Sequence, residues 1–193
     1  MDRDALLGLL DDYARRHPDE SATTERIRRL VHEHERAFHR DCLPGHVTAS
    51  AWIVSRESRQ VLLTHHRKLG RWLQLGGHVD GQTDVLAAAI REAEEESGLA
   101  GFSPLPDAGG PVVLDLDVHV IPARASEPAH EHHDVRFLLE VSQVQPIRRQ
   151  VAESMAVRWF EGAGIEARLE EESLARMARK ASDWLGRRPI GPP

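Results

Sequence analysis

One stretch constrains this chain more than any other: a glycine turn followed by a helix with three glutamates on one side. Gly77 precedes a short polar loop, and hydrophobic periodicity predicts a helix over residues 84–97. Near the end of that helix lie Glu92, Glu95 and Glu96, here called the glutamate trio. Their i, i+3 and i+4 spacing places the carboxylates on one side of the helix. Because like charges repel, the trio requires a partner that neutralises it.

Residues that typically begin and end helices flank the segment that hydrophobic periodicity predicts to be helical. Thr83 or Asp84 can cap the N-terminus, and Gly98 suits the left-handed position that ends a helix. The apolar residues form one stripe, and the trio falls at its edge, where a cleft between core and solvent is expected. The stripe consists of Val85, Leu86, Ala89, Ile90 and Ala93.

Two interpretations of the trio compete. A solvated acidic face would favour Lys or Arg four residues further on, but those positions hold Glu96, Leu99 and Ala100. The other interpretation is a divalent cation, since Mg²⁺ is usually held by carboxylates together with substrate phosphates. The fixed spacing from the glycine turn favours a Mg²⁺ site, with Mn²⁺ as the alternative ion.

The composition narrows the class of partner. The 193 residues suffice for one domain with extensions, and a formal charge of −6 argues against a general nucleic-acid-binding surface. Cys42 is the single cysteine, so an internal disulfide is excluded and a small buried side chain is expected. Neither a secretory signal nor an apolar run of the roughly 20 residues that a membrane span needs is visible. We therefore expect a cytoplasmic protein with no membrane partner.

The pattern divides the chain into a helical extension (residues 1–43), a strand-rich domain (44–186) and a flexible tail (187–193). The extension is predicted to form two helices, and it packs on the domain or supplies a homodimer surface. The first helix covers residues 5–16, and the second starts near 21–24 and runs to about residue 40.

Inside the domain, periodicity predicts strands before and after the glutamate helix. In one of them Leu114 and Leu116 face one way and Asp115 the other, while the run over 135–141 is nearly continuously apolar and is expected to be buried on both faces. The predicted strands cover residues 46–54, 60–66, 71–75, 113–120, 135–141 and 156–160. A final helix is predicted over 165–185, and loops over 104–111 and 122–128.

The stretch from Gly77 to Leu99 resembles the Nudix box, a glycine followed at fixed spacing by Arg-Glu, then Glu-Glu, Gly and an apolar residue. The matching positions are Gly77, Arg91, Glu92, Ala93, Glu95, Glu96, Gly98 and Leu99. The resemblance implies an α/β/α sandwich with a mixed sheet, an N-terminal helical extension and a C-terminal helix. It also implies metal-dependent hydrolysis of a nucleoside diphosphate linked to another group.

One position departs from the box, because the family's first glutamate falls on Thr83, or on Gln82 if the loop is one residue shorter. In the family that glutamate looks like a support for the box arginine. We therefore interpret the chain as an active variant in which Asp84 supports Arg91.

The resemblance also assigns roles to residues near the box. Glu92, Glu95 and Glu96 would bind the metal with the Gly77 carbonyl, and Glu92 and Glu95 are counted among the catalytic residues. Glu153, in a loop shortly before a strand with Trp159, is expected to reach the metals or to activate water. Glu140 competes for that role, as a glutamate in a buried run that must be paired or lie at a strand end.

Basic and histidine residues supply the candidates for substrate binding. The compact basic group contains His66, Arg67 and Arg71 and leads into the glycine turn, so two interpretations stay open, a contact with a substrate phosphate and a solvated hairpin. His78 follows Gly77, and His133 lies in a loop that borders the expected cleft. The His-x-His-His run at 130–133 resembles a transition-metal motif, but a polar loop entering the next strand is the favoured interpretation.

The sequence leaves the substrate open and keeps two other functions in view. A nucleotide-sensing module that binds without hydrolysis is the main alternative, and Thr83 is its support. An isoprenoid diphosphate isomerase of related fold would require a cysteine beside the site, and Cys42 lies outside any such motif. The expected partner is a small-molecule nucleotide or another diphosphate.

Overall fold

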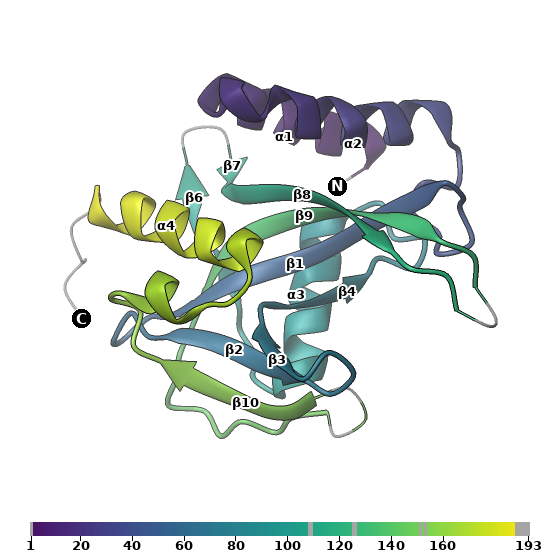
Figure 1. Cartoon of the computed structure of the whole chain (residues 1–193). Helices are drawn as coiled ribbons and strands as arrows, with labels where there is room; N and C mark the ends of the chain where they lie inside the picture. Colours follow the sequence, from purple (N-terminus) through teal and green to yellow (C-terminus); the bar gives the residue numbers. More distant parts are fainter. Residues whose placement is uncertain (1, 108–109, 125–126, 151, 153, 188–193) are drawn as a thin grey trace.

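A mixed sheet of eight strands organises the computed structural model, which describes residues 2–107, 110–124, 127–150, 152 and 154–187. The strands run in the order β10-β2-β1-β9-β5, and β3, β4 and β8 pair with β2, β1 and β9 (Figure 1). Their bounds are β1 Gly45–Ser55, β2 Val61–His66, β3 Arg71–Leu73, β4 Leu75–His78, β5 Ser103–Pro104, β8 Val113–Ile121, β9 His130–Val141 and β10 Ser154–Phe160. The strand predicted over 71–75 is thus divided at Gln74, and Gly76 and Gly77 lie inside β4.

The two central strands decide which side chains meet. Strands β1 and β9 are parallel and pair from Gly45↔Glu131 to Ser55↔Val141. Because side chains alternate along a strand, odd-numbered residues of both strands point to one face and even-numbered residues to the other. Ala49 and Val135 accordingly belong to one hydrophobic cluster, and Trp52 and Leu138 to the second.

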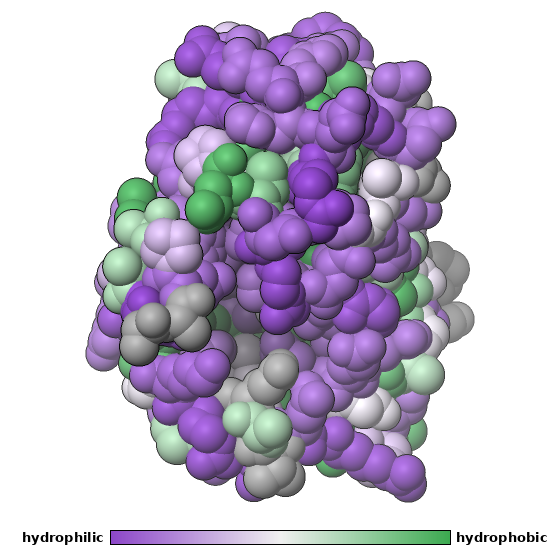
Figure 2. Space-filling view, turned by 90° about the vertical axis from the view of Figure 1, so that its right-hand side faces the viewer, coloured by the Kyte–Doolittle hydropathy of each residue, from purple (hydrophilic) through white to green (hydrophobic). Residues whose placement is uncertain are grey.

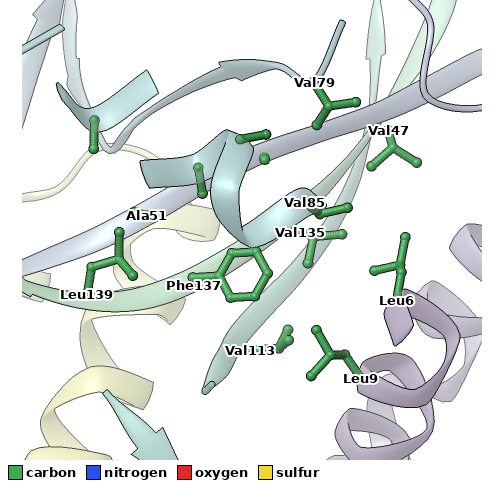
Figure 3. Packing of buried hydrophobic residues seen from close by; sticks show 14 of the residues in the cluster. Leu6, Leu9, Val47, Ala51, Val79, Val85, Val113, Val135, Phe137 and Leu139 are labelled. Atoms are coloured by element: carbon green, nitrogen blue, oxygen red, sulfur yellow. The ribbon is translucent and has the colours of Figure 1, made fainter. Parts of the chain in front are cut away.

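Helices cover both faces, which confirms the predicted α/β/α sandwich. On the odd-numbered face pack α1 (Arg3–Arg16), α2 (Ser21–Glu33) and α3 (Val85–Ser97), which share one hydrophobic cluster with the sheet. Figure 3 shows Leu9 of α1 directed toward Val113, and Leu6 directed toward the part of this cluster with Val47 and Val85. On the even-numbered face lies α4 (Glu172–Gly186), whose Leu174 and Met177 pack in the second cluster.

The second predicted helix is shorter than expected. It ends at Glu33 rather than near Arg40, and His34 already has extended backbone angles. The guanidinium of Arg3 explains the end point, because it donates to the carbonyls of Val31, His34 and Glu35 and so satisfies oxygens at the helix terminus.

The segment after α2 connects the extension to the sheet. The carbonyl of Ala37 accepts from Val47 N in β1 at 2.8 Å, and that of Phe38 accepts from Gly81 N in the loop before α3 at 2.7 Å. Cys42 is buried in this segment, as predicted, and burial raises the pKa of its thiol.

Two further predictions need correction. In β8 an irregularity between Val113 and Asp115 interrupts the pairing with β9. Leu114 therefore packs in the second cluster and Leu116 in the first, although simple alternation predicts the same face for both. The final helix is also divided, into a 3₁₀ turn at Ile165–Arg168 and α4.

Smaller elements and the surface complete the fold. The predicted loop at 104–111 contains short β6 (Pro106–Asp107) and β7 (Gly110–Pro111), and β9 begins at His130 rather than at Val135.

The side seen in Figure 2 is mainly hydrophilic, with a small group of hydrophobic residues at its upper left. Among the described helices, none combines the length and the apolar character that crossing a membrane requires.

Candidate active site

Helix α3 forms as its sequence predicts. Asp84 is the N-cap and its carboxylate accepts from Ala87 N at 2.9 Å, while Gly98 ends the helix in the left-handed conformation at φ 70°. Glu92 and Glu96 are buried on the side that packs against β1 and β4, and Glu95 is exposed. The trio therefore lies at the edge of the packed face, as the apolar stripe predicts.

The carboxylate of Glu92 lies directly against the glycine strand. Gly77 pairs with Ala49 of β1, so a side chain at position 77 would point toward α3. A Cβ atom there would come within 2.5 Å of Glu92 Oε2. Only glycine leaves this volume to the carboxylate, which gives a physical reason for the Gly77–Glu92 combination.

Arg91 connects the trio to the end of β4. Its guanidinium donates to Glu92 Oε1 at 2.7 Å, to Glu95 Oε2 at 3.3 Å and to the His78 carbonyl at 2.9 Å. Partial burial alone would lower the pKa of Arg91, but the charges of Glu92 and Glu95 raise it. The guanidinium is thus held as a permanent cation beside two of the three carboxylates.

The loop before β10 closes the C-terminal end of the same helix. Arg148 N donates to the Ser97 carbonyl at 2.7 Å, and Gln150 N donates to that of Glu96 at 3.2 Å. Glu153 itself lies outside the described residues. Its competitor Glu140 is half-buried and pairs with Arg56 at 3.1 Å, at the turn between β1 and β2.

Asp84 was predicted to support Arg91, and Thr83 to stand where the family has its first glutamate. Asp84 acts as the helix cap, and the partners recorded for Arg91 are Glu92, Glu95 and the His78 carbonyl. The proposed contact between Asp84 and Arg91 stays a prediction. Thr83 is half-buried immediately before the cap.

The predicted substrate contacts are distributed over several elements. His66 ends β2 and its Nδ1 accepts from Leu69 N at 3.3 Å, while Arg67 is exposed in the following turn. Arg71 forms an ion pair with Glu171, the residue that caps α4. His133 is buried in β9 and pairs with Glu131 at 3.1 Å. The basic group is therefore partly engaged within the fold.

Histidines gather on the opposite face of the sheet. His46 in β1 pairs in register with His132 in β9, and their ring centroids are 4.8 Å apart. His130 lies 5.0 Å from His46, and His78 lies 5.1 Å from His46 and from His132. Burial and the neighbouring histidines lower the pKa of His46 to about 4 and that of His132 to about 2.

The same face carries a charge network that the sequence did not predict. Asp115 is fully buried and accepts from Arg136 at 3.1 Å, from Arg176 at 2.8 Å and from Lys180 at 2.7 Å. Arg136 also donates to Asp134 at 2.8 Å, and Ser50 donates to the same carboxylate at 2.8 Å. The sequence signal that could have predicted this network is Arg136, an arginine inside the otherwise mainly apolar run over 135–141.

The comparisons assign the family. A model of the NUDIX domain matches residues 44–181, so this chain belongs to the Nudix family. Its fold and its family are those of hydrolases that act on pyrophosphate bonds. A search of curated proteins finds no match.

Solved structures with a similar fold cover most of the chain. A C. elegans Ap4A hydrolase in a binary complex has a TM-score of 0.58 and 18% identity, over 74% of this chain and 98% of that one. A NUDIX family hydrolase from Clostridium perfringens has a TM-score of 0.56 and 24% identity, over 74% and 99%. The NUDIX domain of Shewanella oneidensis NrtR, complexed with ADP ribose, has a TM-score of 0.52 and 17% identity, over 82% and 97%.

Proposed function

We propose that this protein hydrolyses a phosphoanhydride bond in a nucleoside diphosphate linked to another group, with divalent cations bound by the glutamate trio. The observation that carries the proposal is the Glu92 carboxylate against Gly77, where a Cβ would lie 2.5 Å from Oε2. This arrangement holds a carboxylate oxygen of Glu92 against the half-buried strand β4. Carboxylate oxygens are the donors that Mg²⁺ and Mn²⁺ prefer.

In this proposal each box residue has a distinct task. Glu92, Glu95 and Glu96, with the Gly77 carbonyl, would hold the ions, which when bound neutralise diphosphate oxygens and lower the pKa of water. Arg91 orients Glu92 and Glu95 from the side of β4.

The reaction then needs only water and a base. The water oxygen bonds to one phosphorus, the bond from that phosphorus to the bridging oxygen breaks, and two phosphate-ended products result. Glu153 or Glu92 accepts the proton of the water. The basic group with His66, Arg67 and Arg71, together with His133, remains the proposed contact region for substrate. The ring of His78 lies on the other face of the sheet, against His46 and His132, so this residue meets the site through its carbonyl, which accepts from Arg91.

The test is a product assay on the purified chain with Mg²⁺ or Mn²⁺. The panel contains nucleoside diphosphate sugars, including ADP-ribose, dinucleoside polyphosphates including Ap4A, nucleoside triphosphates and coenzyme A. We expect Glu95→Gln to lower kcat on the order of 10²-fold or more, since a charged ligand of the ions that would neutralise the diphosphate is removed. Glu95 is exposed, so the variant should keep the wild-type melting temperature.

Glu94→Gln is the matched control, because Glu94 is an exposed neighbour on the same helix and lies outside the trio. It should retain wild-type turnover. Full metal-dependent activity in Glu95→Gln would contradict the assignment of the trio.

Thr83 favours one alternative, a module that binds nucleotide without cleaving it. That function predicts saturable nucleotide binding with no product from any substrate of the panel at either metal. Calorimetry run beside the product assay separates the two functions, since only the hydrolase converts what it binds.

A further inference from the structure

Three histidines from two distant segments meet on the face of the sheet opposite the glutamate helix. His46 begins β1, and His130 and His132 begin β9, and each offers a ring nitrogen within 4.8 Å of the others. We call these residues the histidine cluster. They are even-numbered residues of the parallel pair, whereas Gly77 is in register with the odd-numbered Ala49, on whose side Glu92 lies. The cluster is therefore separated from the glutamate trio by the sheet itself.

The rings of His46 and His130 are buried, and not all of their nitrogens form hydrogen bonds. His46 is 1% exposed and His130 is 4% exposed. Among the described residues, no hydrogen bond of ordinary geometry is formed by Nε2 of His130 or by either ring nitrogen of His46, although the Cys42 backbone lies close to the His46 ring. A buried polar atom left in this state costs free energy, so the arrangement calls for a ligand that accepts these lone pairs.

The orientation of His130 is fixed as in a metal ligand. Its Nδ1 lies 3.0 Å from the Pro128 carbonyl, which accepts only from a protonated nitrogen. The proton therefore sits on Nδ1, and Nε2 presents its lone pair to the interior of the cluster. Histidines that bind metals are typically oriented by such a carbonyl on the other ring nitrogen.

We propose that His46, His130 and His132 bind one divalent transition-metal ion of the zinc class. Neutral imidazoles suit Zn²⁺, Co²⁺ and Ni²⁺, whereas Mg²⁺ prefers oxygen, so the two faces of the sheet select different ions. In a tetrahedral zinc site, ligand nitrogens lie about 3.3 Å apart, which ring rotations reach from the present separations. Glu127 Oε1, 3.8 Å from His130 Nε2, is within reach as the fourth ligand.

Binding would join parts of the chain that are far apart in sequence. The ion would tie the start of β1 to the start of β9 and to the hairpin that carries Glu127 and Pro128. This role is independent of hydrolysis and does not rest on the proposed function.

The experiment measures Zn²⁺ and Co²⁺ binding to the whole metal-free chain in a millimolar excess of Mg²⁺, which occupies the carboxylates. Equilibrium dialysis should give one Zn²⁺ per chain, and Co²⁺ should produce the intense visible absorption of a tetrahedral nitrogen site. His132→Gln should weaken Zn²⁺ binding about 10²-fold or more and remove the Co²⁺ spectrum. His132 is only half-buried, so this variant should fold.

His133→Gln is the control, because His133 is the next residue of the same strand, is more deeply buried than His132 and points to the other face. It should bind Zn²⁺ as the wild type does, and so should Glu95→Gln, whose defect concerns hydrolysis. The proposal is overturned if the wild-type chain binds no Zn²⁺ under these conditions or if His132→Gln binds it unchanged. Either result can be obtained whether or not the protein hydrolyses nucleotides.

Discussion

Oε2 of Glu92 occupies the space that a Cβ atom at Gly77 would need, at a separation of 2.5 Å. The glycine is therefore required by a side chain fifteen residues further along the chain, rather than by a turn of its own. Gly77 lies in the extended strand β4, and it is Gly76, at φ 152°, that has a backbone conformation suited to glycine.

Gly77→Ala should lower activity far more than stability. The new methyl group meets the mobile end of a glutamate side chain, so Glu92 can move aside while the strand stays paired. A displacement of about 1 Å of a reacting group costs on the order of 10²-fold in turnover. Kinetics and thermal unfolding on the same sample measure both effects.

Gly8→Ala is the control for a glycine substitution as such. Gly8 lies exposed in α1, and a methyl group added there would meet no neighbouring atom within 4 Å. Alanine should therefore stabilise the protein by about 0.5–1 kcal/mol and leave activity unchanged. A Gly77→Ala variant with wild-type turnover would show that the position of Glu92 is unimportant.

Thr83→Glu should change turnover by less than about fivefold. The box arginine already has two carboxylates and the His78 carbonyl as acceptors, so an added carboxylate has little left to orient. A pair of this kind near the surface is worth about 0.2–1 kcal/mol. Steady-state kinetics decides the matter, and a large gain in kcat would mean that the departure at Thr83 limits the enzyme.

Asp115→Asn should destabilise the protein by about 3–5 kcal/mol, because it leaves Arg136 buried without its full countercharge. Urea unfolding measures the change. Asp183→Asn, at an exposed position of α4, is the control and should fall within about 0.5 kcal/mol of wild type. Equal effects of the two substitutions would deny the network a structural role.

Acid should weaken the metal-free fold in two stages. Burial lowers the pKa of His46 from 6.5 to about 4, so the unfolded chain binds its proton first and stability falls as the pH drops through that range. Burial alone would raise the pKa of Asp115, but Arg176, Arg136 and Lys180 lower it overall. The stability from this carboxylate is complete above about pH 4 and is lost below it.

Urea unfolding between pH 8 and pH 3 tests this prediction in the presence of a chelator. His46→Gln, if folded, should flatten the upper stage, and Asp115→Asn the lower one. A stability that stays constant from pH 7 to pH 5 would contradict the assignment for His46.

The glutamate helix was predictable because its information is local. Its caps, its stripe and the trio all lie within one run of sequence, and the structure reproduces Asp84 and Gly98 in their predicted places. The histidine cluster was not predictable, because it depends on the register of β1 with β9 across 86 residues (132 minus 46). The early end of α2 likewise depends on Arg3, which reaches it from another helix.

The hydrogen bond from Gly81 N to the Phe38 carbonyl has a consequence for how this enzyme can be trimmed. Phe38 lies outside residues 44–181, and so does His39, whose ring a Cβ at Gly81 would meet at 2.6 Å. The loop before α3 is therefore held in place by residues that lie outside the segment matched by the model of the family. A shortened protein starting at Pro44 would keep every residue of the Nudix box but would lose Phe38 and His39, which contact the loop before α3.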